Sequence, residues 1–242
     1  MRMLAPVLPE GGRVLDLGGG DGRLAAALAG AGMSVTLVDS DRAMLDAAHT
    51  SLRARGMADR VTLIEGDAAR CRLTGFDLVC CHSVLMYQQD AGPMLDACVA
   101  ACRPAGAISI ISLNGGASAM RAGLQQRWPS ALAALQGRPL PDEAPVYDHS
   151  REACCAHLAA RGCDAEAWFG LGIFTDHLRG PICMSEEEHD LAVAVETLAG
   201  TVDPYRGIAR CWHVVARRQV SAGKRARRSP RSASRRNSIA GP

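Results

Sequence analysis

The residues best suited to chemistry lie in a glycine-rich loop that follows a short apolar segment. Asp16 stands near the end of this segment, and Gly18, Gly19 and Gly20 follow it closely, with a further glycine at Gly22. Glycine lets the backbone turn sharply and approach a ligand closely. A helix that starts after such a loop presents its free N–H groups to that ligand. The sequence therefore predicts a ligand-binding loop at the carboxyl end of a first strand.

Carboxylates also follow the next two predicted strands. Asp39 ends the second strand, and Asp67-Ala68 follows the third. A carboxylate at Asp39 can accept the protons of both ribose hydroxyls, as in dinucleotide-binding folds. A carboxylate at Asp67 can accept a proton of the adenine amino group. Three acids at three successive strand ends predict a site for a cofactor that contains adenosine.

The glycine loop alone leaves other functions open. The spacing from Gly20 through Gly22 to Ala25 also fits the G-x-G-x-x-A pattern of nicotinamide-binding proteins. A nicotinamide oxidoreductase therefore stays an alternative, as does a protein that binds the cofactor without catalysis. Asp16 and the two later acids favour the adenosine-binding site described above.

Apolar runs and helical patterns alternate along the chain and must position these residues. The predicted strands occupy residues 13–17, 34–38, 61–64, 76–81, 107–113, 165–173 and 211–216. The predicted helices occupy residues 22–30, 41–55, 94–102, 150–161 and 185–198, with one short helix around Trp128. This alternation predicts an α/β fold, with a doubly wound, mostly parallel, Rossmann-like sheet of seven strands whose last strand is antiparallel.

Composition narrows the function classes. Hydrophobic residues form 48% of the 242 residues, which excludes a wholly disordered chain, and no uncharged stretch is long enough to span a bilayer. The ten cysteines form no CxxC pair, so we expect reduced thiols in a cytoplasmic protein without a metal site.

Nine basic residues and no acid follow Ala216, which leaves 18 basic against 25 acidic residues before them. The body is therefore acidic, and residues 219–242 are predicted to form a disordered basic tail that can bind a phosphate backbone.

The D-x-G-x-G-x-G segment and the two later acids resemble those of the class I S-adenosylmethionine-dependent methyltransferases, over residues 10 to 113. The resemblance implies methyl transfer from S-adenosyl-L-methionine. Further motifs extend it to residues 10 to 217, where the chain looks like the bacterial tRNA 5-carboxymethoxyuridine methyltransferases. These motifs are Cys81–Leu85, Ser112–Gly116, Phe174–Arg179, Glu196, Asp203–Tyr205 and Ala209–Val214.

This closer resemblance implies a substrate and a set of site residues. The family methylates the carboxylate of a modified wobble uridine in tRNA and forms a methyl ester, so no general base is expected. A small-molecule carboxyl-, O- or N-methyltransferase stays the alternative. The motif and the resemblance together assign to the cofactor Asp16, Gly18, Gly19, Gly20, Asp39, Asp67, Ala68 and His82. The residues expected to face the substrate are Tyr87, Asn114, Asp176, Arg179, Tyr205 and Arg210.

The same resemblance suggests a domain organisation. Residues 1–218 are expected to form one methyltransferase domain. Insertions at about 114–148 and 180–205 are expected to build a small helical lid over the substrate. The expected partners are tRNA or a small-molecule acceptor, and no membrane.

Overall fold

The computed structural model describes residues 3–8, 10–141, 146–178 and 184–220. Within these residues the chain forms a seven-stranded sheet in the order β3-β2-β1-β4-β5-β7-β6. The strands are β1 (Arg13–Leu17), β2 (Ser34–Asp39), β3 (Val61–Glu65), β4 (Phe76–His82), β5 (Cys102–Leu113), β6 (Cys163–Leu171) and β7 (Cys211–Arg218). Neighbouring strands from β3 to β5 are parallel, whereas β7 is antiparallel to both β5 and β6. The predicted mostly parallel sheet with an antiparallel last strand is confirmed.

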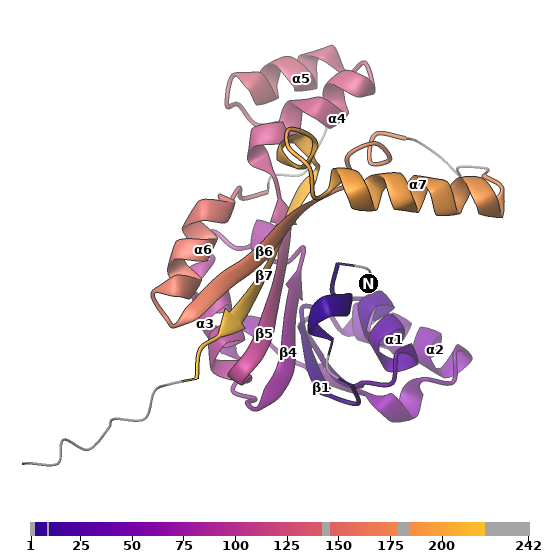
Figure 1. Cartoon of the computed structure of the whole chain (residues 1–242), viewed down its shortest axis with the longest axis vertical. Coiled ribbons are helices and arrows are strands. Elements are labelled where there is room, and N and C mark those ends of the chain that lie inside the picture. Colours follow the sequence, from indigo (N-terminus) through magenta and orange to yellow (C-terminus); the bar gives the residue numbers. More distant parts are fainter. Residues whose placement is uncertain (1–2, 9, 142–145, 179–183, 221–242) are drawn as a thin grey trace, which may run out of the picture.

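Helices cover both faces of the sheet, as the doubly wound prediction requires. The helices are α1 (Arg23–Gly30), α2 (Arg42–Ala54), α3 (Gly92–Ala101), α4 (Ser118–Leu124), α5 (Trp128–Leu135), α6 (Arg151–Ala159) and α7 (Glu186–Ala199). Figure 1 shows α1 and α2 on one face and α3 and α6 on the other. Because successive strand residues point to opposite faces, each face builds its own apolar core.

Two clusters of buried side chains hold these layers together. On one face, Val14 and Leu37 of the central strands pack with Leu28 of α1. On the other face, Ile110 of β5 packs in one cluster with Leu95 of α3 and with Leu158 of α6. Strands that are apolar on both faces are expected in a parallel sheet between two helical layers.

The strand order reverses direction at the centre of the sheet. β1 lies between β2 and β4, so the chain that follows β3 crosses over to the other side of β1. The connections after β1 and β4 therefore diverge at the carboxyl ends of these strands. In open α/β sheets, ligands bind at this switch point. The predicted glycine loop follows β1 and lies at this place.

The two predicted helix starts that depend on serine caps are confirmed. Ser150 accepts a hydrogen bond from the Ala153 N–H at 3.1 Å and begins α6. Ser185 and Glu188 form a reciprocal capping box at the start of α7. Three acids in the first turn of α7 also complement the positive end of the helix dipole.

Some predicted boundaries were wrong. β5 begins at Cys102 instead of residue 107, because Cys102 pairs with Phe76 before a register shift. The expected single helix near Trp128 is a pair, α4 and α5, since Gln126 takes a positive φ of 59° and breaks the helix between them. β6 is shifted two residues toward the N-terminus and ends before Gly172, which has a φ of 69°.

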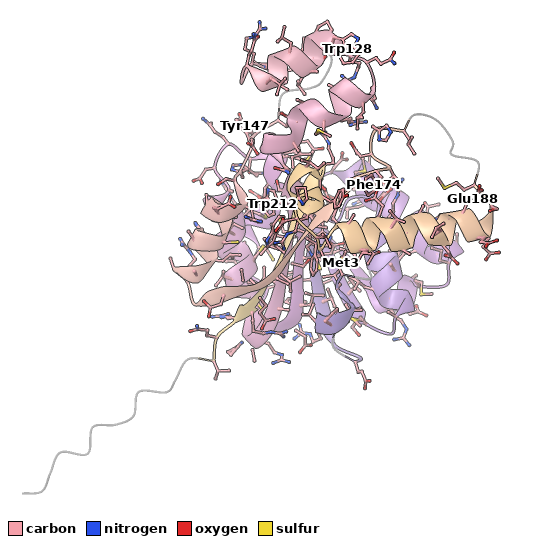
Figure 2. The ribbon with its side chains drawn as sticks, turned by 45° about the horizontal axis from the view of Figure 1, so that its top comes forward. Met3, Trp128, Tyr147, Phe174, Glu188 and Trp212 are labelled. Atoms are coloured by element: carbon pink, nitrogen blue, oxygen red, sulfur yellow. The ribbon has the colours of Figure 1, made fainter. Side chains whose placement is uncertain are left out.

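Two parts of the fold stand outside the helical layers. Figure 1 shows the α4–α5 pair beyond the carboxyl ends of the parallel strands, and α7 extending beside it. Trp128 at the start of α5 is 64% exposed and lies on the outer part of this pair (Figure 2). These are the segments in which the sequence predicts a lid.

The predictions on membrane spans, cysteines and the tail can be compared only with the residues that the structure describes. In the described part of the chain, no helix is both long enough and apolar enough to cross a membrane. Nine of the ten cysteines are described, and all nine are free thiols. The predicted disordered tail, residues 219–242, lies outside the described residues except for Gln219 and Val220, and so do residues 180–183 of the second insertion.

Candidate functional site

The loop after β1 needs glycine because its neighbours leave no room for a side chain. A Cβ atom at Gly18 would lie 2.5 Å from a methyl carbon of Val84, and one at Gly19 would lie 2.5 Å from Leu37. Gly20 has a φ of 54°, and a Cβ there would meet no atom within 4 Å. The loop is therefore packed against the sheet at its first two glycines and open at the third, where its backbone is accessible to a ligand.

Asp39 joins the glycine loop to the end of β2. Its Oδ2 accepts a hydrogen bond from the Gly20 N–H at 2.8 Å, and its Oδ1 accepts one from the Asp41 N–H at 2.9 Å. Each carboxylate oxygen has two lone pairs, so both oxygens can accept a further proton donor. The half-buried Asp39 carboxylate is thus fixed by the backbone and retains the capacity to bind a ribose diol.

Asp16 is the acid that this site buries most deeply. It is 1% exposed, and its Oδ2 has no hydrogen-bond partner among the described residues. Burial, together with the negative charge of Asp39, raises the pKa of this carboxyl to about 7. A buried polar atom without a partner is costly, so this oxygen is suited to a donor that a ligand supplies.

The end of β3 carries the predicted Asp67-Ala68 pair. Asp67 is exposed and caps a short 3-10 helix, Ala68–Arg70, by accepting a hydrogen bond from the Ala69 N–H at 2.9 Å. Its second oxygen lies 3.4 Å from Nε of Arg70. Ala68 is buried. β3, β2 and β1 are adjacent, so Asp67, Asp39 and Asp16 follow one edge of the sheet.

His82 lies at the end of β4, on the other side of β1 from Asp39. Its Nε2 is 2.7 Å from the Ser109 hydroxyl of β5. Burial, together with the neighbouring His213, lowers the pKa of His82 to about 3, so the imidazole is neutral at physiological pH. The structure therefore brings all eight predicted cofactor residues to the carboxyl ends of four adjacent strands.

Three residues expected to face the substrate lie on separate segments. Asn114, just after β5, donates hydrogen bonds from Nδ2 to the carbonyl oxygens of Gly207 and Ala209, both at 3.0 Å. Tyr87, in the 3-10 turn after β4, is 69% exposed. Tyr205 is also exposed, and its ring centroid lies 5.9 Å from that of Phe174. The Asn114 side-chain N–H groups thus hold the segment before β7 in place.

Asp176 and Arg210 form a cluster with a residue that the sequence did not indicate. Oδ2 of Asp176 is 3.8 Å from Nε of Arg210 and 3.5 Å from Nε of Arg121. Both distances exceed hydrogen-bond length, and neither Asp176 Oδ2 nor Arg121 Nε has a hydrogen-bond partner among the described residues. Two guanidinium groups thus lie beside one carboxylate near the end of β5. Arg179 lies outside the described residues.

Arg121 was missed because α4 was not predicted. Gln125, the C-cap of α4, donates a hydrogen bond from Nε2 to the His177 carbonyl at 2.8 Å. This bond holds α4 against the turn that carries Asp176 and so brings Arg121 to it. If a helix had been predicted in this part of the insertion, the arginine within it would have been the signal for this cluster.

Two cavities lie near the second group of residues. One of about 660 Å³ is lined by Asn114, Tyr147 and Arg210 and lies between the end of β5 and the α4–α5 insertion. Another of about 940 Å³ lies between the end of β6 and α7, with Met3 in its wall. Figure 2 shows Met3 below α7 and Tyr147 near the base of the α4–α5 pair. The first cavity reaches the Asp176–Arg210 cluster at Arg210, and its wall also contains Arg138 and Asp148.

Comparison with known proteins identifies the cofactor class. A family model described as a methyltransferase domain matches residues 14–106, which run from β1 into β5 and include the acids at all three strand ends. The chain is an S-adenosylmethionine-dependent methyltransferase. Its cofactor is S-adenosyl-L-methionine.

Relatives extend beyond this domain. The chain is 27% identical over 226 residues to the tRNA 5-carboxymethoxyuridine methyltransferase of Escherichia coli K12, which covers 92% of this chain and 86% of that protein. It is 32% identical over 105 residues to a ubiquinone biosynthesis O-methyltransferase of Thiobacillus denitrificans, which covers 43% and 45%. The first similarity spans both halves of this methyltransferase, and the second spans less than half of it.

Solved methyltransferases share the fold. An S-adenosylmethionine-dependent methyltransferase from Mesorhizobium loti superimposes with a TM-score of 0.57 at 19% identity and covers 90% of this chain and 96% of its own. Magnesium protoporphyrin IX methyltransferase from Synechocystis, with bound S-adenosylhomocysteine, gives a TM-score of 0.57 at 15% identity and covers 90% and 78%. At these identities the likeness concerns the fold alone.

Proposed function

We propose that this methyltransferase acts on tRNA and methylates the carboxylate of a 5-carboxymethoxyuridine at the wobble position, forming a methyl ester. The observation that carries the proposal is the similarity to tRNA 5-carboxymethoxyuridine methyltransferase over 92% of the chain. This similarity includes the second half of the chain, where the acceptor residues of the proposal lie. The ubiquinone-related matches cover less than half of the chain.

The cofactor residues divide according to the parts of S-adenosyl-L-methionine. Asp39 accepts the two ribose hydroxyl protons, since both of its oxygens are fixed by backbone N–H groups and retain lone pairs. Asp67 and Ala68 hold the adenine. The glycine loop, Gly18 to Gly20, and the buried Asp16 bind the amino-acid end, and His82 faces the cofactor from β4. The unpartnered Oδ2 of Asp16 and the open backbone at Gly20 support this arrangement.

The acceptor side holds an anion and removes it from water. Bound S-adenosyl-L-methionine supplies an electrophilic methyl group on a sulfonium. A carboxylate acceptor is already deprotonated at neutral pH, so the protein needs no general base. Its task is to place the carboxylate in line and to exclude water. The two guanidinium groups of Arg121 and Arg210, which lie within 3.8 Å of the Asp176 carboxylate, support a carboxylate-binding role because a guanidinium group suits a carboxylate.

The remaining acceptor residues complete this site. Asn114 orders the segment before β7, and Tyr87 and Tyr205 supply exposed rings beside it for the base and ribose of the uridine. Arg179 adds a further positive charge.

In this proposal, residues 1–218 form one methyltransferase domain. The insertions at about 114–148 and 180–205 act as its lid, and residues 219–242 are a disordered basic tail.

A second candidate function is methylation of a small-molecule carboxyl, hydroxyl or amine group. The similarity to ubiquinone biosynthesis O-methyltransferases supports it. So does the charge of residues 1–216, which hold 18 basic against 25 acidic residues and therefore repel a polyanion. The tRNA proposal is favoured by the greater length of its similarity.

The test is methyl transfer to tRNA that carries or lacks the carboxylate. Purified enzyme is incubated with labelled S-adenosyl-L-methionine and with tRNA from cells that make 5-carboxymethoxyuridine or from cells that do not. The proposal expects label in the first tRNA only, in a nucleoside that alkali converts back to the acid. Label in neither tRNA, with label in a small carboxylic acid, phenol or amine pool, would establish the second function instead.

A further inference from the structure

Three polar side chains form a buried chain across three adjacent strands. His82 ends β4, Ser109 lies in the middle of β5, and His213 lies in β7. The Ser109 hydroxyl is 2.7 Å from Nε2 of His82 and 2.8 Å from Nε2 of His213. Ser109 is fully buried and His213 is 2% exposed. The two imidazole rings lie edge to face, with their centroids 5.7 Å apart.

The proton count of this chain restricts both histidines. A serine hydroxyl carries one proton, and among the described residues Ser109 Oγ bonds only to the two Nε2 atoms. Its two lone pairs could also accept from both rings, but its own buried proton would then have no acceptor, which is costly. Ser109 therefore donates to one imidazole and accepts from the other. The imidazole that donates is protonated on Nε2 and the one that accepts is protonated on Nδ1, so the two neutral rings have opposite tautomers.

Both rings are also held in their neutral form. Burial lowers the pKa of His82 to about 3 and the pKa of His213 to about 4. A neutral imidazole is suited to a site for a sulfonium cofactor, because an imidazolium would repel the positive charge. Among the described residues, Nδ1 of His82 has no hydrogen-bond partner. It is not one of the unpartnered side-chain atoms there that are fully buried, so it keeps some solvent exposure. It is therefore accessible to a ligand.

We propose that Ser109 and His213 are positioning residues that set the tautomer and ring orientation of His82 toward S-adenosyl-L-methionine. The shared hydroxyl determines whether Nδ1 of His82 offers the cofactor a lone pair or a proton, and His213 fixes that choice from the far side. This inference rests on the proposed role of His82 at the cofactor. His213 acts through Ser109 and does not itself touch the cofactor.

The chain offers a matched control for Ser109. Ser112 lies three residues further along β5 and is also fully buried, but it points to the opposite face of the sheet. Its hydroxyl has no hydrogen-bond partner among the described residues. Ser112→Ala therefore removes the same hydroxyl oxygen from the same strand without breaking a hydrogen bond. Comparison of the two variants separates the loss of the hydrogen bonds to the histidines from the loss of a buried oxygen.

The first measurement is the ¹⁵N spectrum of the histidine side chains in the full chain, with and without S-adenosylhomocysteine. His82→Gln and His213→Gln assign the two signals. We expect neutral rings of opposite tautomer throughout pH 6 to 8. Two rings of the same tautomer, or a charged ring in this range, would overturn the inference whatever the mutants do.

The second measurement is calorimetric binding of S-adenosylhomocysteine. Ser109→Ala is expected to weaken binding about tenfold and to change the ¹⁵N signals of both histidines, while Ser112→Ala matches the wild type. Equal binding by the two alanine variants, with weakened binding in His82→Ala, would keep His82 at the cofactor but remove the positioning role. Unchanged binding in His82→Ala would remove His82 from the cofactor site and overturn both assignments.

Discussion

Asp39 provides the sharpest test of the cofactor site, because its carboxylate has separable structural and binding roles. In Asp39→Ala the Gly20 and Asp41 N–H groups lose their acceptors. Asp39 is half-buried, so water replaces part of what is lost, and we expect a loss of stability of about 1–2 kcal/mol. The proposed bonds to two ribose hydroxyls are charge-assisted and contribute about 1.5–3 kcal/mol each. Their loss should lower S-adenosylhomocysteine affinity at least ~100-fold.

Asp41→Ala is the matched control for this experiment. The Asp41 side chain caps α2 by accepting from the N–H groups of Ala43 and Met44, so its removal costs about 1 kcal/mol of stability. The backbone N–H that binds Asp39 is retained in this variant. Calorimetry below the melting temperature of both variants should give wild-type affinity for Asp41→Ala and severely weakened affinity for Asp39→Ala. Tight binding by Asp39→Ala would refute the ribose assignment, and equal weakening in both would attribute the effect to stability.

Three further predictions concern the rest of the molecule. Arg121→Gln and Arg210→Gln should each raise KM for the tRNA acceptor about tenfold and leave S-adenosylhomocysteine affinity unchanged by calorimetry; unchanged KM in both would exclude these two arginines from acceptor binding. The Asp16 carboxyl binds its proton more tightly in the folded chain, where its pKa is about 7, than in the unfolded chain, where it is 3.8. Stability in the absence of cofactor should therefore fall by up to about 4 kcal/mol as pH rises from about 4 through 7, and urea unfolding of Asp16→Asn should lack this fall. Deletion of residues 219–242 should weaken RNA binding and reduce its dependence on salt, whereas equal salt slopes for both chains would rule out phosphate contacts by the tail.

The positions of the proposed cofactor residues could be predicted from the sequence because they depend on local signals. Each strand is a short apolar run, and Asp16, Asp39 and Asp67 stand at or just after the ends of three of them. In a parallel sheet the carboxyl ends of neighbouring strands meet at one edge, so strand prediction alone brings these acids together. The glycines of the loop are also visible in the sequence. The structure explains two of them, because close packing against Val84 and Leu37 leaves no room for a side chain.

The acceptor half depends on contacts between distant segments and is predicted less well. Arg121 approaches Asp176 only because α4 forms and Gln125 holds it to the carbonyl of His177. No periodic pattern in the insertion indicated that helix. Nothing near Asn114 in the sequence indicated that its amide N–H groups bind carbonyls 93 and 95 residues further along the chain.

Ser109 and Ser112 illustrate the physical limit most directly. Both are serines in β5 and both are fully buried, so strand propensity and residue hydrophobicity do not distinguish them. Their difference comes from the pleat, which turns one toward His82 and His213 and the other toward the opposite core. His82 and His213 reach Ser109 from 27 and 104 residues away, through the register of β5 with a parallel strand on one side and an antiparallel strand on the other. A one-residue slip of either neighbour would turn its histidine to the other face. The proposed control of the His82 tautomer therefore depends on strand register, which no local pattern around any of the three residues encodes.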